Sequence, residues 1–358
     1  MKIVVLIGGG RTGIDFFQSL LDGHPQIIQF PGVFYFDEFL KRIKKLNDAK
    51  KICQIFLDYN KNFFDSRKNK RERHHKLGKN RNQFFKVSKL KFEKSFIKII
   101  SKKNINNKKD LLISLHQAYH FAIKKKFNQK NSLIVLHLHH VYRLTCMKGL
   151  KYSIVYTVRH PFASITSLLN HWFKVDQIKR TAPEWFYFQL DRIFYGIKKS
   201  QTFAPTSVIK LENLLINNIK IMKKFCKKFN INFNNCLGRS TYHNLIWWGD
   251  KVSIKYLNGF NKNFKNKIDY SLFFKNDLLF LSKKLKKLMI NFNYDLIVDN
   301  SSRGYHFLPM KVELIILKNI LLKLEIKSLF KFIFYYFKRI ALLNDNTYDK
   351  VNFKKELI

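Results

Sequence analysis

Short apolar runs alternate with amphipathic segments along the chain. Runs of β-branched and apolar residues have the length of buried strands at 2–7, 132–138, 153–158 and 206–211. Apolar residues recur at helical spacing over 13–22, 34–58, 89–101, 109–127, 161–174, 183–199 and 217–229. Strands that alternate with helices predict an α/β fold, in which a central parallel sheet lies between two helical layers.

A glycine-rich turn follows the first strand. Gly8, Gly9 and Gly10 permit a tight turn and close backbone approach, and the helical pattern begins at Gly13. Free N–H groups at the start of a helix favour an anion. The turn therefore predicts a phosphate-binding site, with a plain strand-to-helix linker as the alternative.

Three phosphate-binding patterns compete for this turn. Residues 8–13 fit the dinucleotide fingerprint G-x-G-x-x-G, but the acidic residue that this motif requires about 20 positions on comes late. The same residues have the outer spacing of a P-loop, in which Ile14 and Asp15 would replace the required Lys and Ser/Thr. The third interpretation gives Arg11, inside the turn, the role of a cation that faces a phosphate or sulfate.

The stretch GGGRTGIDFFQSLLDGHPQI resembles the 5′-phosphosulfate loop of the sulfotransferases, which use 3′-phosphoadenosine-5′-phosphosulfate (PAPS). That loop is Lys or Arg, Ser/Thr, Gly and two hydroxyl residues, and bacterial members end the next helix in a Leu-Leu-Asp-x-His-Pro-like stretch. Residues 11–13 and 20–25 match this pattern, whereas Ile14 and Asp15 depart from it. The resemblance implies that the cofactor's phosphosulfate is bound by Gly10, Arg11, Thr12, Gly13, Ile14 and Asp15.

A second stretch, YSIVYTVRHPFASITSLLNHW, resembles the 3′-phosphate site of the same family. Arg159 stands at the end of a strand, and Pro161 suits the first turn of the following helix. In the sulfotransferases a strand-end Arg and a Ser eight residues later bind the 3′-phosphate, and Arg159 and Ser167 have that separation. Arginine presents a planar fork to phosphate oxygens. The alternative is a capped helix whose arginine makes an ordinary surface ion pair.

Three histidines lie in SLIVLHLHHVYRL, residues 132–144. The catalytic His of cytosolic sulfotransferases precedes the 3′-phosphate Arg by 22 residues, as His137 precedes Arg159 here. A neutral imidazole suits removal of a proton from an acceptor hydroxyl. His139 lies on the same strand face and could take this role, whereas His140 faces the other way. Structural histidines and an acidic base remain alternatives; no metal is expected, because no carboxylate or cysteine accompanies the histidines at ligand spacing.

Two further stretches resemble the family loosely. GRSTYHNLIWWGD, residues 238–250, resembles a late loop that bacterial members fold over the cofactor. Arg239 and Trp248 would then contact phosphate and adenine, because aromatic side chains stack on bases. The two tryptophans at 247–248 could equally belong to the core. IKLENLL, residues 209–215, predicts a structural role for Glu212.

The composition adds a strong charge imbalance. The chain has 68 Lys+Arg against 24 Asp+Glu, a formal net charge of +44. Such a surplus attracts anions, but it does not indicate whether the anion is a cofactor, an acidic glycan, nucleic acid or an anionic lipid. The apolar start is too short for a signal peptide and no segment reads as a membrane span, which predicts a cytoplasmic protein. Residues 329–343, LFKFIFYYFKRIALL, could lie on a membrane surface or dock as a helix.

We therefore predict a sulfotransferase domain over 1–308 and a helical tail over 309–358, with a basic insertion at about 61–110 on the acceptor side. PAPS would be the cosubstrate, without a metal, and the acceptor would be a hydroxyl of a carbohydrate or cell-surface polymer. Arg11 and His137 would be catalytic, and nucleic acid is not an expected partner. The alternatives are a P-loop-type nucleotide-binding kinase, or a non-catalytic basic protein that binds nucleic acid or acidic polymer.

Overall fold

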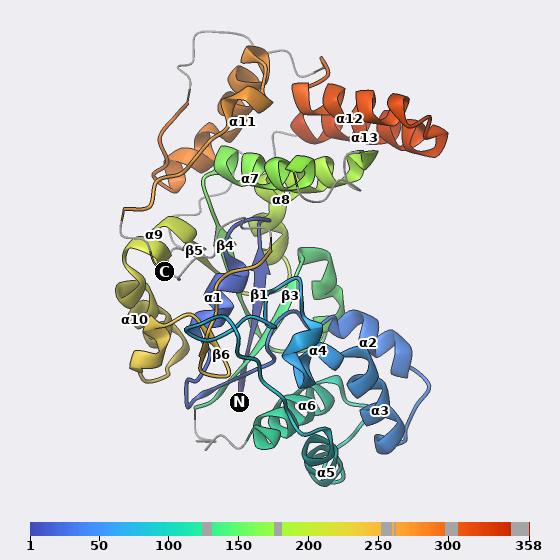
Figure 1. Ribbon diagram of the computed structural model, residues 1–358, viewed down its shortest axis with the longest axis vertical. Coiled ribbons are helices and arrows are strands. Elements are labelled where there is room, and N and C mark those ends of the chain that lie inside the picture. Colours follow the sequence, from blue (N-terminus) through green and yellow to red (C-terminus); the bar gives the residue numbers. More distant parts are fainter. Residues whose placement is uncertain (124–130, 175–180, 252–259, 261–262, 298–306, 345–357) are drawn as a thin grey trace.

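The computed structural model describes residues 1–123, 131–174, 181–251, 260, 263–297, 307–344 and 358 (Figure 1). In chain order, its elements are β1 (Lys2–Gly8), α1 (Ile14–Leu20), β2 (Ile27–Gln29), α2 (Phe36–Ile43), α3 (Ala49–Tyr59), α4 (Lys61–Phe64), η1 (Ser66–Lys68), α5 (Lys89–Ile100), α6 (Lys108–Ala122), β3 (Leu133–His139), η2 (Val141–Met147), β4 (Ser153–Val158), α7 (Pro161–Lys174), α8 (Pro183–Gln201), β5 (Thr206–Lys210), α9 (Leu211–Ile216), α10 (Asn218–Phe229), η4 (Asn235–Gly238), β6 (Thr241–Tyr242), β7 (Leu245–Ile246), η5 (Tyr270–Leu272), α11 (Lys275–Asn291), α12 (Lys311–Leu322) and α13 (Ile326–Asn344).

A five-stranded sheet of order β2-β3-β1-β4-β5 forms the centre of the fold, and all its strands are parallel. Alternate residues of β1 enter two different cores. Val4 and Leu6 pack with α1 and α10, whereas Val5 and Ile7 pack with helices that include α2, α3, α5, α6 and α8. Figure 1 shows α10 and the α2–α6 group on opposite sides of the sheet. The predicted three-layer α/β fold is thus confirmed.

The helical segments predicted over 34–58 are two helices, α2 and α3. α2 ends at Ile43, and α3 begins at Ala49 because the Asp48 side chain accepts hydrogen bonds from the N–H groups of Lys50 and Lys51. Asp48 therefore acts as an N-cap in the middle of a continuous apolar pattern.

The sequence pattern also missed three short strands and one long helix. β2 has only three residues, and β6 and β7 form a small antiparallel hairpin within the late loop. α11 lies in a part of the chain for which no helix was predicted. A strand of two or three residues is too short to show a period.

The predicted tail contains two helices, α12 and α13, and α13 packs against α8. Arg339 and Glu313 form a buried ion pair between them, with Arg339 Nη2 at 2.7 Å from Glu313 Oε2. Among the described residues, no helix combines the length and apolar character needed to cross a membrane.

The order of the strands fixes where a site can form. β1 lies between β3 and β4, so the chain leaves neighbouring strands in different directions at their carboxyl ends. Parallel α/β sheets open a crevice at such a point. The ends of β1, β3 and β4 are Gly8, His139 and Val158, next to the residues that the sequence motifs single out.

Candidate functional site

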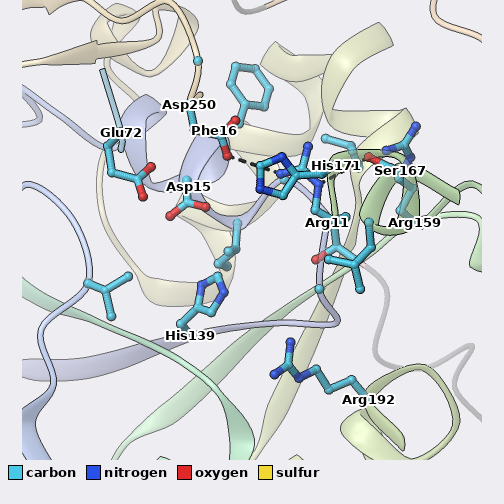
Figure 2. Close-up of a pocket in the computed structure, with 18 of the residues that line it drawn as sticks. Arg11, Asp15, Phe16, Glu72, His139, Arg159, Ser167, His171, Arg192 and Asp250 are labelled. Carbon is cyan, nitrogen blue, oxygen red and sulfur yellow. Dashed lines mark hydrogen bonds and ion pairs between the residues drawn. The ribbon is translucent and has the colours of Figure 1, made fainter. Parts of the chain in front are cut away.

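A cavity of about 800 Å³ opens beyond the carboxyl ends of the sheet (Figure 2). It contains most of the predicted site, because its lining includes Gly10, Arg11, Thr12, Gly13, Ile14, Asp15, Arg159 and Ser167. His137, Arg239 and Trp248 are not among the described lining residues.

The glycine turn is held in a conformation that favours glycine. Gly10 and Gly13 have φ of 80° and 77°, and Arg11 between them has φ of 55°. A Cβ on Gly10 would lie 2.2 Å from Gln189 Oε1, and one on Gly13 would lie 2.4 Å from Leu211 Cδ1. Gln189 donates hydrogen bonds to the carbonyl oxygens of Gly9 and Gly10 and so ties α8 to the turn.

Arg11 joins the first motif to the second. Its Nε donates to Ser167 Oγ at 3.3 Å, and its Nη1 lies 3.3 Å from Asp250 Oδ2. Ser167 stands on α7, which follows the strand that ends before Arg159. The two motifs, 156 residues apart in sequence, therefore meet in one cavity.

Arg159 is held by neutral groups. Its Nε donates to Asn266 Oδ1 at 3.3 Å, and its guanidinium lies 5.8 Å from the centre of the Phe264 ring. Burial lowers the pKa of Arg159 to about 10, although Glu212 opposes the shift. Glu212 itself accepts hydrogen bonds from the His160 N–H, Asn266 and Tyr294, which agrees with the structural role predicted for it.

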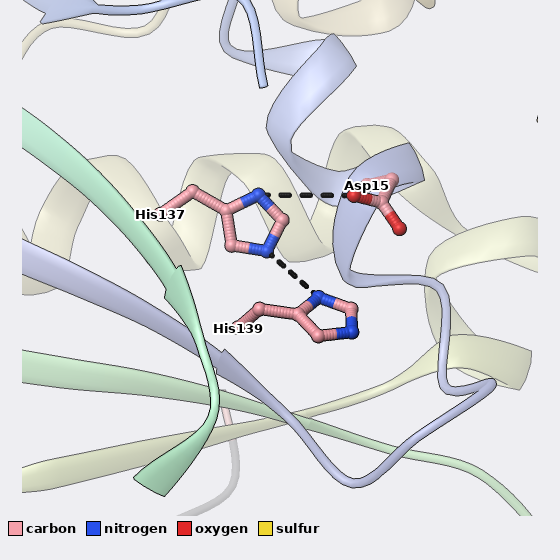
Figure 3. Close-up of side chains that lie close together, drawn as sticks. All are labelled: Asp15, His137 and His139. Atoms are coloured by element: carbon pink, nitrogen blue, oxygen red, sulfur yellow. Dashed lines mark hydrogen bonds and ion pairs between the residues drawn. The ribbon is translucent and has the colours of Figure 1, made fainter. Parts of the chain in front are cut away.

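The histidines form a hydrogen-bonded chain (Figure 3). The Gln18 amide donates to the carbonyl oxygens of Phe30 and Gly32, so its Oε1 accepts from His137 Nδ1 at 2.8 Å. His137 Nε2 is then the acceptor for His139 Nδ1–H at 3.3 Å. These hydrogen bonds place the proton of neutral His139 on Nδ1 and its lone pair on Nε2.

His139, rather than His137, lines the cavity. The His137 side chain is fully buried, while a register shift between β1 and β3 and a φ of 69° at His139 end the strand. Burial lowers the pKa of both imidazoles, so both are neutral at pH 7. Strand alternation indicated that the two histidines share a face, but it did not reveal this difference in depth.

Three carboxylates, from Asp15, Glu72 and Asp250, lie close together near His139. Asp15 Oδ1 lies 3.7 Å from His137 Nδ1, and carboxylate oxygens of Asp15, Glu72 and Asp250 lie within 4.8 Å of one another. Burial, with Asp15 and Asp250 nearby, raises the pKa of Glu72 well above its usual value. Both this group and the set Asp15, His137 and His139 have distances that a metal ion could use. Spacing along the chain could not reveal these groups, because Asp15, Glu72, the histidines and Asp250 come from segments far apart.

The late loop contacts the basic insertion. Trp247 lines the cavity and donates from Nε1 to the Glu72 carbonyl, whereas Trp248 Nε1 donates to the Gly78 carbonyl. The Arg239 N–H bonds to the Cys236 carbonyl at the end of η4. The structure therefore does not bring Arg239 and Trp248 into the cavity lining, and Trp248 packs instead between the late loop and the insertion.

Fold and cavity together define an α/β protein with an arginine-lined cavity beyond the carboxyl ends of its sheet. No protein-family model matches the chain, and no curated protein matches it. The structure is similar to the sulfotransferase domain of the Synechococcus PCC 7002 olefin synthase, at 12% identity and a TM-score of 0.39 over 71% of this chain and 79% of that one. It is similar to the sulfotransferase domain from the curacin biosynthetic pathway, at 15% identity and a TM-score of 0.36 over 89% and 96% of the two chains. A third similar structure is the sulfotransferase STF9 from Mycobacterium avium, at 10% identity and a TM-score of 0.34 over 66% and 65%.

Proposed function

We propose that the protein is a sulfotransferase that uses PAPS. The contact between Arg11 and Ser167 carries this proposal, because it joins the phosphosulfate-type loop to the 3′-phosphate-type motif in a single cavity. A nucleotide with phosphates at both its 5′ and 3′ positions has the charge distribution that such a pair of motifs would recognise.

Arg11 and Arg159 would bind different phosphate groups of the nucleotide. The backbone of residues 10–13 and the Arg11 side chain would hold the 5′-phosphosulfate, with Thr12 acting through its N–H because its hydroxyl bonds Thr157. Arg159 and Ser167 would hold the 3′-phosphate. A half-buried guanidinium held by an amide gains a strong charge-assisted partner when a phosphate arrives.

The reaction would be an in-line displacement at sulfur. The acceptor oxygen forms a bond to sulfur while the bond from sulfur to the 5′-phosphate oxygen breaks, and adenosine 3′,5′-bisphosphate leaves. His139 Nε2 would take the acceptor proton, with His137 holding its tautomer, and Glu72 is the acidic alternative. Arg11 would stabilise the charge that grows on the leaving oxygen.

Nucleotide binding tests the proposal. Calorimetry with adenosine 3′,5′-bisphosphate, 5′-AMP and ADP should show a preference for the 3′-phosphate, and Arg159→Ala should weaken bisphosphate binding about 10-fold or more, since a charged hydrogen bond is lost. Arg239→Ala is the matched control, and we expect it to bind normally because Arg239 lies outside the cavity lining. The preference should persist in EDTA.

Two results would contradict the proposal. Equal weak binding of the three nucleotides would mean that the motifs have the shape of a nucleotide site without the function. Tight binding of ATP that requires Mg²⁺ would favour the kinase alternative.

A further inference from the structure

Five arginines line the cavity, and four of them are paired with carboxylates, held by an amide or exposed to solvent. Arg143 Nη1 and Nη2 bond the carboxylates of Asp37 and Glu38 at 2.5 and 2.9 Å. Arg11 pairs with Asp250, Arg159 is held by Asn266, and Arg71 is exposed to solvent beside Glu72. The fifth arginine is Arg192, on α8.

The Arg192 guanidinium makes no hydrogen bond or ion pair within the described part of the chain. Its neighbour Asp191 lies 2.7 Å from Lys199 Nζ and is thus already paired. Burial lowers the pKa of Arg192, whereas the weaker effects of Tyr156, Tyr142 and Asp191 raise it. A desolvated cation without a partner is costly, and an anion that enters the cavity would remove that cost.

The fold holds Arg192 at the histidine end of the cavity. Gln189, one turn earlier on α8, is tied to the glycine turn, and the Tyr156 hydroxyl donates to the Arg192 carbonyl. The charge of Arg192 contributes to the lowered pKa of His139 and His140. In Figure 2, Arg192 lies apart from Arg11, Ser167 and Arg159, which are drawn close to one another.

We propose that Arg192 binds an anionic group of the acceptor, so that the substrate class is an acidic, hydroxyl-bearing glycan. This inference rests on the proposed function, which puts the acceptor hydroxyl next to His139. His140, also in the lining, has an Nδ1 without a hydrogen-bond partner among the described residues and would add a second polar contact. A carboxylate or a sulfate offers paired oxygens to the guanidinium fork.

A matched pair of sugars tests this site. With the protein saturated in adenosine 3′,5′-bisphosphate, calorimetry compares p-nitrophenyl β-D-glucuronide with p-nitrophenyl β-D-glucoside, which lacks the carboxylate. We expect the glucuronide to bind about 10-fold tighter or more, the value of one charged hydrogen bond. Arg192→Gln should remove this preference and leave bisphosphate affinity unchanged, whereas Arg192→Lys should retain part of it. Arg71→Gln, in an exposed arginine of the same lining, is the control and should keep the preference.

The possible failures are distinguishable. Equal affinity for the two sugars, or no binding of the glucuronide, would overturn the acceptor site. A loss of bisphosphate affinity in Arg192→Gln would assign Arg192 to the nucleotide and would also overturn it. If the wild type shows no preference for the 3′-phosphate, the proposed cofactor fails instead, and the sugar comparison is repeated without nucleotide, where the same criteria apply.

A second surface, outside the cavity lining, is formed by α12 and α13. Large apolar side chains are exposed at the turn between these helices, where Leu324 is 86% and Ile326 70% exposed. On α13, the exposed residues Ile326, Phe330, Ile333, Phe334 and Phe337 fall within an arc of about 100°. We call this set, together with Leu321, Leu322 and Leu324, the apolar stripe.

The helix α13 thus has two apolar faces. Phe332 and Leu343 are buried on the side that packs on the rest of the chain, while the apolar stripe faces outward. Exposed lysines flank the stripe at positions 327, 331 and 338, and Lys338 Nζ lies 4.4 Å from the centre of the Phe334 ring. An outward apolar stripe with a lysine border suits the interface of an anionic membrane, where aromatic rings enter the acyl boundary and lysines meet lipid phosphates.

We infer that the apolar stripe binds an anionic lipid surface. Co-sedimentation should show binding to vesicles that contain phosphatidylglycerol, weaker binding to pure phosphatidylcholine, and release by salt. The double substitution Phe330→Ser with Phe334→Ser should reduce binding about 10-fold or more. Phe203→Ser, at an exposed phenylalanine outside the stripe, is the control. Absence of vesicle binding would overturn the inference, as would a concentration-dependent dimer that the double variant abolishes without any vesicle binding.

Discussion

Replacement of Arg11 by alanine is expected to lower turnover with PAPS about 10²-fold or more, the size of effect seen when one donor to a developing oxyanion is removed. Arg11 lies inside the glycine turn and contacts Ser167. From this position its guanidinium can stabilise negative charge on the phosphosulfate and, in the transition state, on the leaving oxygen. The measurement is the release of adenosine 3′,5′-bisphosphate from PAPS, with a panel of neutral and acidic oligosaccharides as acceptors.

Two further substitutions make this prediction specific. Arg11→Lys keeps the charge but loses the planar fork, and we expect intermediate turnover. Asp250→Asn removes the carboxylate that lies 3.3 Å from Arg11 Nη1 and competes with an incoming phosphosulfate, so the KM for PAPS should not rise. Turnover of Arg11→Ala close to that of the wild type would contradict the role of Arg11 in the transition state.

The positions of the main strands, and of the two motifs that follow them, could be predicted because they depend on local pattern. β1, β3, β4 and β5 are apolar runs of five to seven residues, and each appears where the sequence indicated. Arg11 and Ser167 lie at fixed positions after such strands, so a parallel sheet was sufficient to bring them to one edge.

The rest of the cavity could not be predicted because it depends on tertiary packing. Glu72 lies between η1 and α5, in a stretch without a helix or strand, and Asp250 lies in the late loop, which contacts that stretch. Arg192 appears in the sequence as an ordinary polar position of an amphipathic helix, and only the ties from Gln189 to the glycine turn show that it faces the site. The choice between His137 and His139 likewise depends on a register shift that no alternation pattern reveals.

Replacement of His139 by asparagine is expected to reduce turnover by about 10²- to 10⁴-fold, the range for loss of a general base. Asparagine tolerates the left-handed backbone that His139 adopts at a φ of 69°, so the substitution removes the imidazole with little strain. Affinity for adenosine 3′,5′-bisphosphate should stay within about 2-fold, less than the cost of one lost hydrogen bond. Unchanged turnover would exclude His139 as the base and favour an acidic group such as Glu72.

The partner residue His137 is expected to act through the pKa of His139. Burial lowers that pKa first, and the nearby imidazole of His137 lowers it further. Since only neutral His139 can accept a proton, turnover should fall on the acid side, below the usual range of a histidine. His137→Gln removes the second influence, so the pKa of His139 rises and the acid limb of the pH–rate profile moves to higher pH, while Ser19→Ala, on the neighbouring helix α1, leaves it in place. A His137→Gln profile that coincides with the wild type would show that His137 has no part in positioning the base, and a loss of turnover equal to that of His139→Asn at every pH would make His137 itself the stronger candidate.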